Sequence, residues 1–142
     1  MEWDKFNKGV FLVNVLAIVY DPKAKKVLIG RRENDPHLKN LNWAFPGGRP
    51  NYKGDLESSL KEQVRIKTGL EINIKKIIFA KTYPEKREFL SIYYFCKRIG
   101  GKEKAGELFV EIKWVKPNEV VDYFKSSTST HPKIVEFLHS LK

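Results

Sequence analysis

The feature that most constrains this chain is an amphipathic helix placed between two groups of strand-like segments. The helix is predicted to begin after Asp55, whose side chain suits the free backbone N–H groups of a helix start. Apolar or small side chains then recur every four residues until Gly69, which ends the pattern as helix-terminating glycines do. Such a helix must bury one face, so the flanking strands are expected to form the surface that it covers.

Segments rich in β-branched and aromatic residues lie on both sides of this helix. Strands are predicted over residues 10–20, 26–32, 72–82, 87–97 and 109–115, and the first two form a hairpin. A loop is expected over 33–42, and helices over 117–123 and 132–141, the last capped by Ser129 or Thr130. Strands grouped in this way predict an α/β fold with a mixed sheet, in one domain spanning residues 1–142.

The charge balance is strongly positive. The chain has 27 Lys and Arg against 17 Asp and Glu, a formal net charge of +10. This surplus favours an anionic partner, a phosphate-bearing small molecule or RNA, and a solvated lysine-rich surface is the alternative. The single cysteine, Cys96, excludes an internal disulfide, and no apolar run is long enough to span a membrane. A cytoplasmic protein is expected, and a monomer and a homodimer both stay open.

Two adjacent glycines, Gly47 and Gly48, directly precede the loop that leads into the helix. Glycine lets a backbone approach a ligand closely, and a helix that begins soon afterwards offers free N–H groups to an anion. A plain turn is the alternative for a Pro-Gly-Gly segment. The loop is therefore a candidate phosphate-binding element.

Four segments resemble the Nudix hydrolase family, and the resemblance covers most of the chain. They are Gly30-Arg31-Arg32, Pro46-Gly47-Gly48 after a tryptophan, the helix end Thr68-Gly69-Leu70 and the strand 111–115. The resemblance implies a Nudix-type α/β/α sandwich. It also implies hydrolysis of nucleoside diphosphates linked to another group, with Mg²⁺ or Mn²⁺ held by glutamates of the helix.

The helix departs from the family's pattern at every metal-binding position. With Gly48 and Gly69 as fixed points, the acidic positions of the pattern hold Gly54, Gln63, Ile66 and Lys67. Mg²⁺ prefers carboxylate oxygens, and Lys67 would place a positive charge where the ion sits. The metal therefore stays unassigned, with Glu62 as the nearest acid for a relocated site.

The first half of the chain also resembles the GDP-mannose mannosyl hydrolase branch of the family. In that branch one arginine ends the second strand, another follows the two glycines, and both bind the substrate diphosphate. The matching residues here are Arg32 and Arg49. A guanidinium suits phosphate oxygens because it donates two parallel hydrogen bonds. Lys67 is expected to supply part of the missing cation's charge, and ordinary surface arginines are the alternative for the other two.

Two further residues, Glu107 and Tyr52, complete the candidate site. Glu107 lies in a glycine-containing loop, where Nudix enzymes often place a general base, so it joins Glu62 as a candidate catalytic residue. Tyr52 flanks the Gly-Gly loop and is the exposed aromatic candidate for stacking a nucleobase. The basic run over residues 97–104 is expected to form a hairpin tip.

Two functional hypotheses from different classes follow. The first is a divergent Nudix protein that binds a nucleotide or a nucleoside-diphosphate derivative, with altered or weak hydrolysis. The alternative is a catalytically inactive Nudix-fold module that binds RNA or a protein partner. A third interpretation is a working hydrolase with an unrecognised carboxylate site, built from Asp55, Glu57, Glu62 or Glu107.

Overall fold

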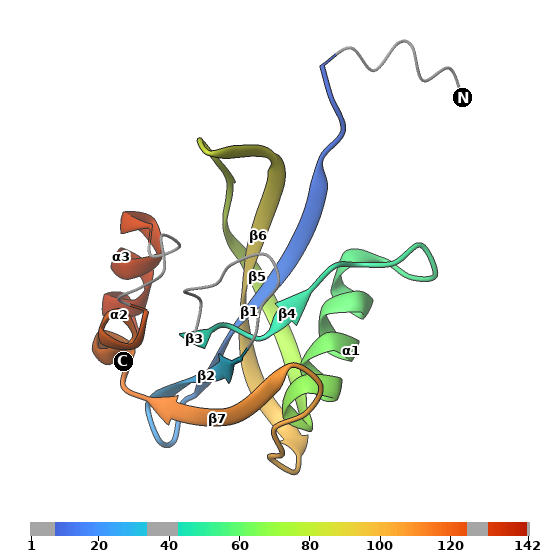
Figure 1. The fold of residues 1–142 in the computed structure, drawn as a ribbon. Helices are drawn as coiled ribbons and strands as arrows, with labels where there is room; N and C mark the ends of the chain where they lie inside the picture. The colour runs from blue at the N-terminus through green and yellow to red at the C-terminus, as the bar shows by residue number, and fades with distance from the viewer. Residues whose placement is uncertain (1–7, 34–42, 125–130, 142) are drawn as a thin grey trace.

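The computed structural model describes residues 8–33, 43–124 and 131–141. Most of the loop expected over 33–42 lies outside these residues, as do Ser129 and Thr130. The described chain forms one seven-stranded sheet with helices on both faces (Figure 1). The predicted α/β class and α/β/α layering are confirmed.

The sheet is mixed because its central strand has neighbours of both directions. β1 (Leu12–Asp21) runs parallel to β6 (Lys86–Gly101) and antiparallel to β2 (Lys26–Arg32), with which it forms the predicted hairpin. The main strand order is β3-β2-β1-β6-β5, where β3 is Trp43–Ala44 and β5 is Leu70–Tyr83. Two further strands lie off this path: β4 (Gly47–Gly48) pairs with β1, and β7 (Phe109–Val115) pairs with β2.

Alternating side chains of β1 divide the core into two layers. Val15, Ala17 and Val19 pack on the side of α1 (Leu56–Thr68). Ile18 and Tyr20 belong to the other cluster, which includes side chains of α2 (Val120–Tyr123) and α3 (Pro132–Ser140). Successive side chains of a strand point to opposite faces, so a strand covered on both faces is apolar throughout.

Both ends of α1 form as the sequence predicts. The Asp55 carboxylate accepts a hydrogen bond of 2.7 Å from the backbone N–H of Ser58. At the other end Gly69 has φ 75°, and its N–H donates to the carbonyl of Arg65. None of the helices in the described ranges is both long and apolar enough to cross a membrane.

One local prediction is wrong. Residues 97–101 are not a hairpin tip: they continue β6 and pair with the start of β5, while a short turn between Tyr83 and Lys86 joins the two strands. The N-cap residue of α3 is His131, whose Nδ1 accepts a hydrogen bond of 3.1 Å from the N–H of Lys133. A short 3-10 helix, η2 (Pro117–Glu119), precedes α2.

We expect Gly69→Ala to lower the free energy of unfolding by at least about 1 kcal/mol, because an L-residue is strained at φ 75°. An alanine Cβ would also collide with the backbone oxygen of Lys102. The matched control is Gly54→Ala, whose Cβ would meet only Ser58 Cβ at 3.4 Å. Urea unfolding of both variants measures the difference, and equal stabilities would contradict the assigned role of Gly69.

Candidate functional site

Lys67 lies in the last turn of α1 and points toward the Gly-Gly strand. Only 8% of Lys67 is exposed, and its ammonium donates a hydrogen bond to the backbone carbonyl of Gly47. This contact joins the end of the helix to β4, twenty residues earlier in the chain. A buried ammonium is costly unless it is partnered, so the contact fixes both the side chain and the strand.

Two side chains of α1, those of Gln63 and Lys67, lie close to Gly48. A Cβ placed on Gly48 would lie 2.8 Å from Gln63 Oε1 and 3.3 Å from Lys67 Nζ. A larger residue here would have to displace the Gln63 amide, so the glycine permits this close approach. Gln63 was not among the candidate site residues of the sequence, although the family's pattern places a glutamate at this position.

A loop from β6 to β7 holds the same helical turn from the other side. The N–H of Lys104 donates to the carbonyl of Thr68, and the N–H of Gly106 donates to the carbonyl of Lys67, each at 2.9 Å. Glu107 follows with φ 53°, a left-handed conformation uncommon outside glycine. The loop thereby brings Glu107 into electrostatic range of Lys67.

Charges around Lys67 act on it in opposite directions. Burial lowers the pKa of the Lys67 ammonium below its ordinary value, and the positive charge of Arg32 lowers it further. The carboxylate of Glu107 acts the other way and raises the pKa of Lys67. The neighbour Arg31 is engaged elsewhere, with hydrogen bonds of 2.9 Å to Glu111 and 2.7 Å to Glu33.

The structure thus brings together five of the eight residues that the sequence selected. They are Gly47, Gly48, Lys67, Arg32 and Glu107. Arg49 and Tyr52 are exposed in the loop between β4 and α1, and Arg49 directly follows Gly48.

Glu62 lies apart from this group, on a different side of α1. Its carboxylate binds the Arg65 guanidinium with contacts of 2.6 and 3.1 Å, and these hydrogen bonds lower the pKa of Glu62. It lines a separate hollow of about 380 Å³ with Lys61 and Arg65. Glu62 and Lys67 are five residues apart, which on a helix of 3.6 residues per turn puts their side chains in different directions.

The residues present do not fit the metal that the family resemblance implies. Gly54, Gln63 and Ile66 supply no carboxylate, and the Lys67 ammonium occupies the Gly47 carbonyl. Across residues 8–33, 43–124 and 131–141, no three His, Cys, Asp or Glu side chains converge to hold a metal ion. The site is a cationic cluster with one nearby carboxylate.

The fold is an α/β/α sandwich in which a Gly-Gly strand is followed by a helix, as expected for the Nudix family. Comparison with known proteins agrees. The NUDIX domain model matches residues 10–138, so the chain belongs to the Nudix family. No curated protein matches the sequence.

Solved structures share the fold at low sequence identity. A MutT protein from Methanosarcina mazei Go1 is 16% identical over 93% of each chain, with a TM-score of 0.71. A NUDIX hydrolase from Nitrosomonas europaea is 14% identical, with a TM-score of 0.77 over 92% of this chain and 72% of that chain. A C. elegans Ap4A hydrolase is 12% identical, with a TM-score of 0.67 over 89% of this chain and 92% of its own.

Replacing Lys67 by methionine should remove a pH dependence of stability. The folded pKa of Lys67 is lowered, so the unfolded chain binds more protons between that value and the unfolded pKa of about 10.4. The stability of the natural protein relative to Lys67→Met should therefore rise with pH through this window.

Urea unfolding near pH ~7 and pH ~10 measures this change. Lys61→Met is the control, because it removes an exposed lysine of the same helix. A stability difference between the natural protein and Lys67→Met that stays constant across the window would contradict a desolvated Lys67.

Proposed function

We propose that this Nudix protein binds a nucleotide or nucleoside-diphosphate derivative through a cationic site that works without a divalent metal. The observation that carries the proposal is the buried ammonium of Lys67 against the Gly47 carbonyl. In this arrangement an amino group takes the position where the family's pattern has an acid. In the family's pattern the Gly-Gly loop lies next to the metal-bound diphosphate. In this chain the same loop lies next to the positive charge of Lys67.

Arg32 and Arg49 complete the charge that two phosphate groups need. Arg32 lies close enough to influence Lys67, and Arg49 is exposed directly after Gly48. Each guanidinium can donate two parallel hydrogen bonds to phosphate oxygens, and the ammonium of Lys67 adds a further positive charge. Tyr52 is exposed in the same loop, and we assign it the role of stacking on the nucleobase.

Hydrolysis is proposed to be weak and metal-independent. Glu107 is the carboxylate that acts on Lys67, so we assign it the role of general base toward an attacking water. Glu62 is held by Arg65 and is the weaker candidate for that role. Because no metal lowers the pKa of the attacking water, turnover should fall far below that of metal-dependent relatives. Structural neighbours named as hydrolases support this ancestry.

The test is calorimetric titration of ADP and of GDP-mannose, with and without Mg²⁺. The natural protein should bind at least one of them equally well in both conditions. Lys67→Glu should weaken binding about tenfold or more without Mg²⁺, because a charge-assisted contact is lost and a like charge is added. It should also make binding depend on Mg²⁺, since a carboxylate then faces the Gly47 carbonyl.

Arg65→Glu is the matched control, because it makes the same charge change on an exposed side of the same helix. Equal weakening in both variants would mean that only net charge matters. Release of phosphate or of a nucleoside monophosphate that requires Mg²⁺ in the natural protein would overturn the metal-independent site. Glu107→Gln should abolish any metal-free release while leaving affinity for ADP in place.

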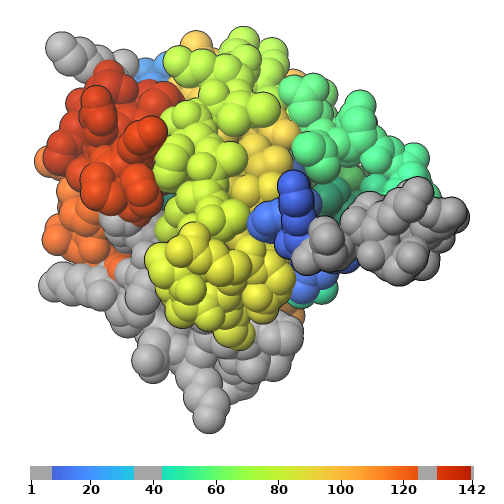
Figure 2. Space-filling view, turned by 90° about the horizontal axis from the view of Figure 1, so that it is seen from above, coloured from blue at the N-terminus to red at the C-terminus, as the bar shows by residue number. Residues whose placement is uncertain are grey.

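RNA binding is a second candidate, favoured by a surface at the end of the β5–β6 hairpin. Lys81 Nζ lies 4.4 Å from the ring centre of Tyr83, and Lys86 Nζ lies 5.5 Å from that of Phe89. Figure 2 looks onto this end, where the hairpin stands between α3 and the segment that leads to α1. Single-stranded RNA could stack bases on these rings while the lysines move to phosphates.

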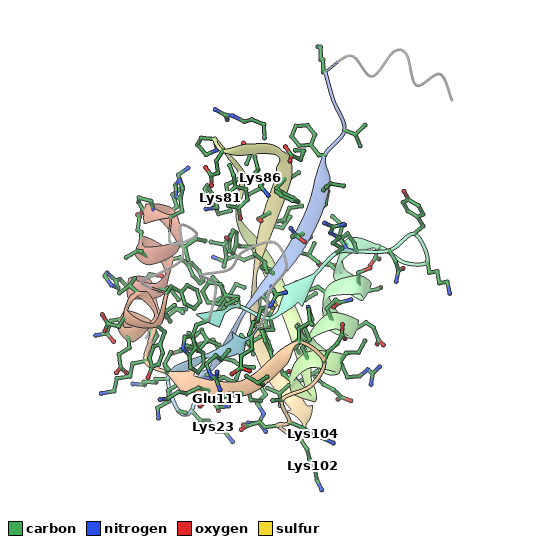
Figure 3. The ribbon with its side chains drawn as sticks, in the orientation of Figure 1. Lys23, Lys81, Lys86, Lys102, Lys104 and Glu111 are labelled. Carbon is green, nitrogen blue, oxygen red and sulfur yellow. The ribbon has the colours of Figure 1, made fainter. Side chains whose placement is uncertain are left out.

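Removing the two lysines should weaken binding of a fluorescent single-stranded RNA and reduce its salt dependence. The slope of log affinity against log salt should fall by about 0.7 for each lost phosphate contact. Lys102→Ala with Lys104→Ala is the control for Lys81→Ala with Lys86→Ala, because both pairs remove two charges from opposite ends of the molecule (Figure 3). No RNA binding at low salt, or the same loss in both double variants, would contradict a specific surface.

A further inference from the structure

A second hollow lies at the far end of the molecule from Lys67. Its volume is about 700 Å³, within the range of small-molecule sites. Three segments line it: the turn between β1 and β2, the chain around the start of η2, and the C-terminal end of α3. The proposed diphosphate site does not use any of these segments.

The hollow and the Lys67 cluster lie at opposite ends of the strand β2. β2 begins at Lys26, beside the turn that lines this hollow, and ends at Arg32, beside Lys67. Seven strand residues at ~3.3 Å each put roughly 20 Å between these ends. β7 runs the opposite way and delivers the chain to Lys116 at the hollow. The hollow is therefore a separate feature of the fold.

The lining combines an aliphatic floor with a basic rim. Leu138, of which 1% is exposed, lies with Leu141 and Pro117, and the rim carries Lys25, Lys116 and His139. The remaining lining residues, Ala24 and Asn118, carry no charge. Every ionisable side chain that lines the hollow in the described part of the chain is basic.

Nearby carboxylates are engaged by the backbone. Asp21 accepts hydrogen bonds from the N–H groups of Lys23 and Ala24, at 2.9 and 3.3 Å. Glu119 accepts one of 3.2 Å from the N–H of Lys116. These bonds hold the two acids in the local turns, and within the described residues neither acid forms an ion pair with Lys25 or Lys116.

The turn also fixes where Lys25 stands. Its φ is 57°, and its N–H donates a hydrogen bond of 2.7 Å to the carbonyl of Asp21. The backbone of Lys25 is thus fixed beside the hollow, and its exposed side chain can reach the rim.

We propose that this hollow binds a small organic anion in which one carboxylate or phosphate group is attached to an apolar body. The charged group would lie at the rim between Lys25 and Lys116, and the apolar body would cover Pro117 and Leu141. Burial of an alkyl or aryl group supplies affinity, while the two ammonium groups select for the anion. The site is independent of the Lys67 cluster and of whether that cluster binds nucleotides.

The experiment follows ¹H–¹⁵N NMR spectra of the ¹⁵N-labelled protein during titration with octanoate and, separately, with phenyl phosphate at low salt. Saturable shifts should concentrate at residues 24–25, 116–118 and 138–141 with at least one of the two probes. The better probe identifies the preferred head group. Octanol and inorganic phosphate, which each lack one half of the ligand, should bind at least about tenfold more weakly.

Lys25→Glu with Lys116→Glu should weaken binding of the better probe by about tenfold or more. Lys23→Glu with Lys133→Glu makes the same charge change outside the lining and should leave binding within about twofold. Lys67→Glu should also leave it unchanged, which separates this proposal from the diphosphate site.

Absence of saturable shifts at these residues with both probes would overturn the proposal. So would octanol binding as tightly as octanoate, or equal weakening in both double variants. Folding of each variant is checked from the dispersion of its own spectrum.

Discussion

The hydrogen bond from the buried ammonium of Lys67 to the Gly47 carbonyl is the contact on which the site depends. It joins the last turn of α1 to β4, and β4 in turn pairs with the central strand β1. The same helical turn also accepts backbone hydrogen bonds from the loop before β7. The last turn of α1, the strand β4 and this loop therefore meet around Lys67, whose side chain carries a positive charge.

A cation at this junction changes what the fold can recognise. Burying an ammonium costs free energy, which its carbonyl partner and the charge of Glu107 partly offset. Arg32 makes the local balance more positive. A ligand that brings negative charge would relieve the repulsion between Arg32 and Lys67, whereas a divalent cation would increase it. The electrostatics of the cluster thus favour anions over metals.

Features that depend on local spacing could be predicted from the sequence. Both ends of α1 and the β1–β2 hairpin follow from capping residues and from short-range patterns, and the structure confirms them. With Gly48 and Gly69 as fixed points, the family pattern assigns Lys67 to a position that binds the metal in the family, and this indicated that Lys67 lies near the glycines.

Long-range pairing could not be predicted in the same way. Parallel pairing of β1 with β6, and the continuation of β6 through residues 97–101, depend on contacts between distant segments. Which side of α1 faces the Gly-Gly strand depends on how the helix packs against the sheet, where it buries Leu60 and Val64. His131 as a cap was missed because histidine is not among the usual capping residues.

The basic side chains behind the net charge of +10 differ in whether they are paired with a carboxylate. Among the described residues, Arg31, Arg65 and Arg98 each contact a glutamate at the surface, so these three charges are locally balanced. Such exposed pairs contribute little to stability and leave those arginines engaged. Lys67 differs from these arginines because it is buried and no carboxylate of the described residues lies within salt-bridge distance of it.

The loop that closes over α1 does so through its backbone. Lys104 and Gly106 use their N–H groups, so these hydrogen bonds to the helix do not depend on which side chains the two positions carry. Gly106 is the exception, because a Cβ there would press on the carbonyl of Ile66. Evolution could therefore rewrite the charges displayed around the site, including the acid at position 107, while the scaffold that aims them keeps its shape.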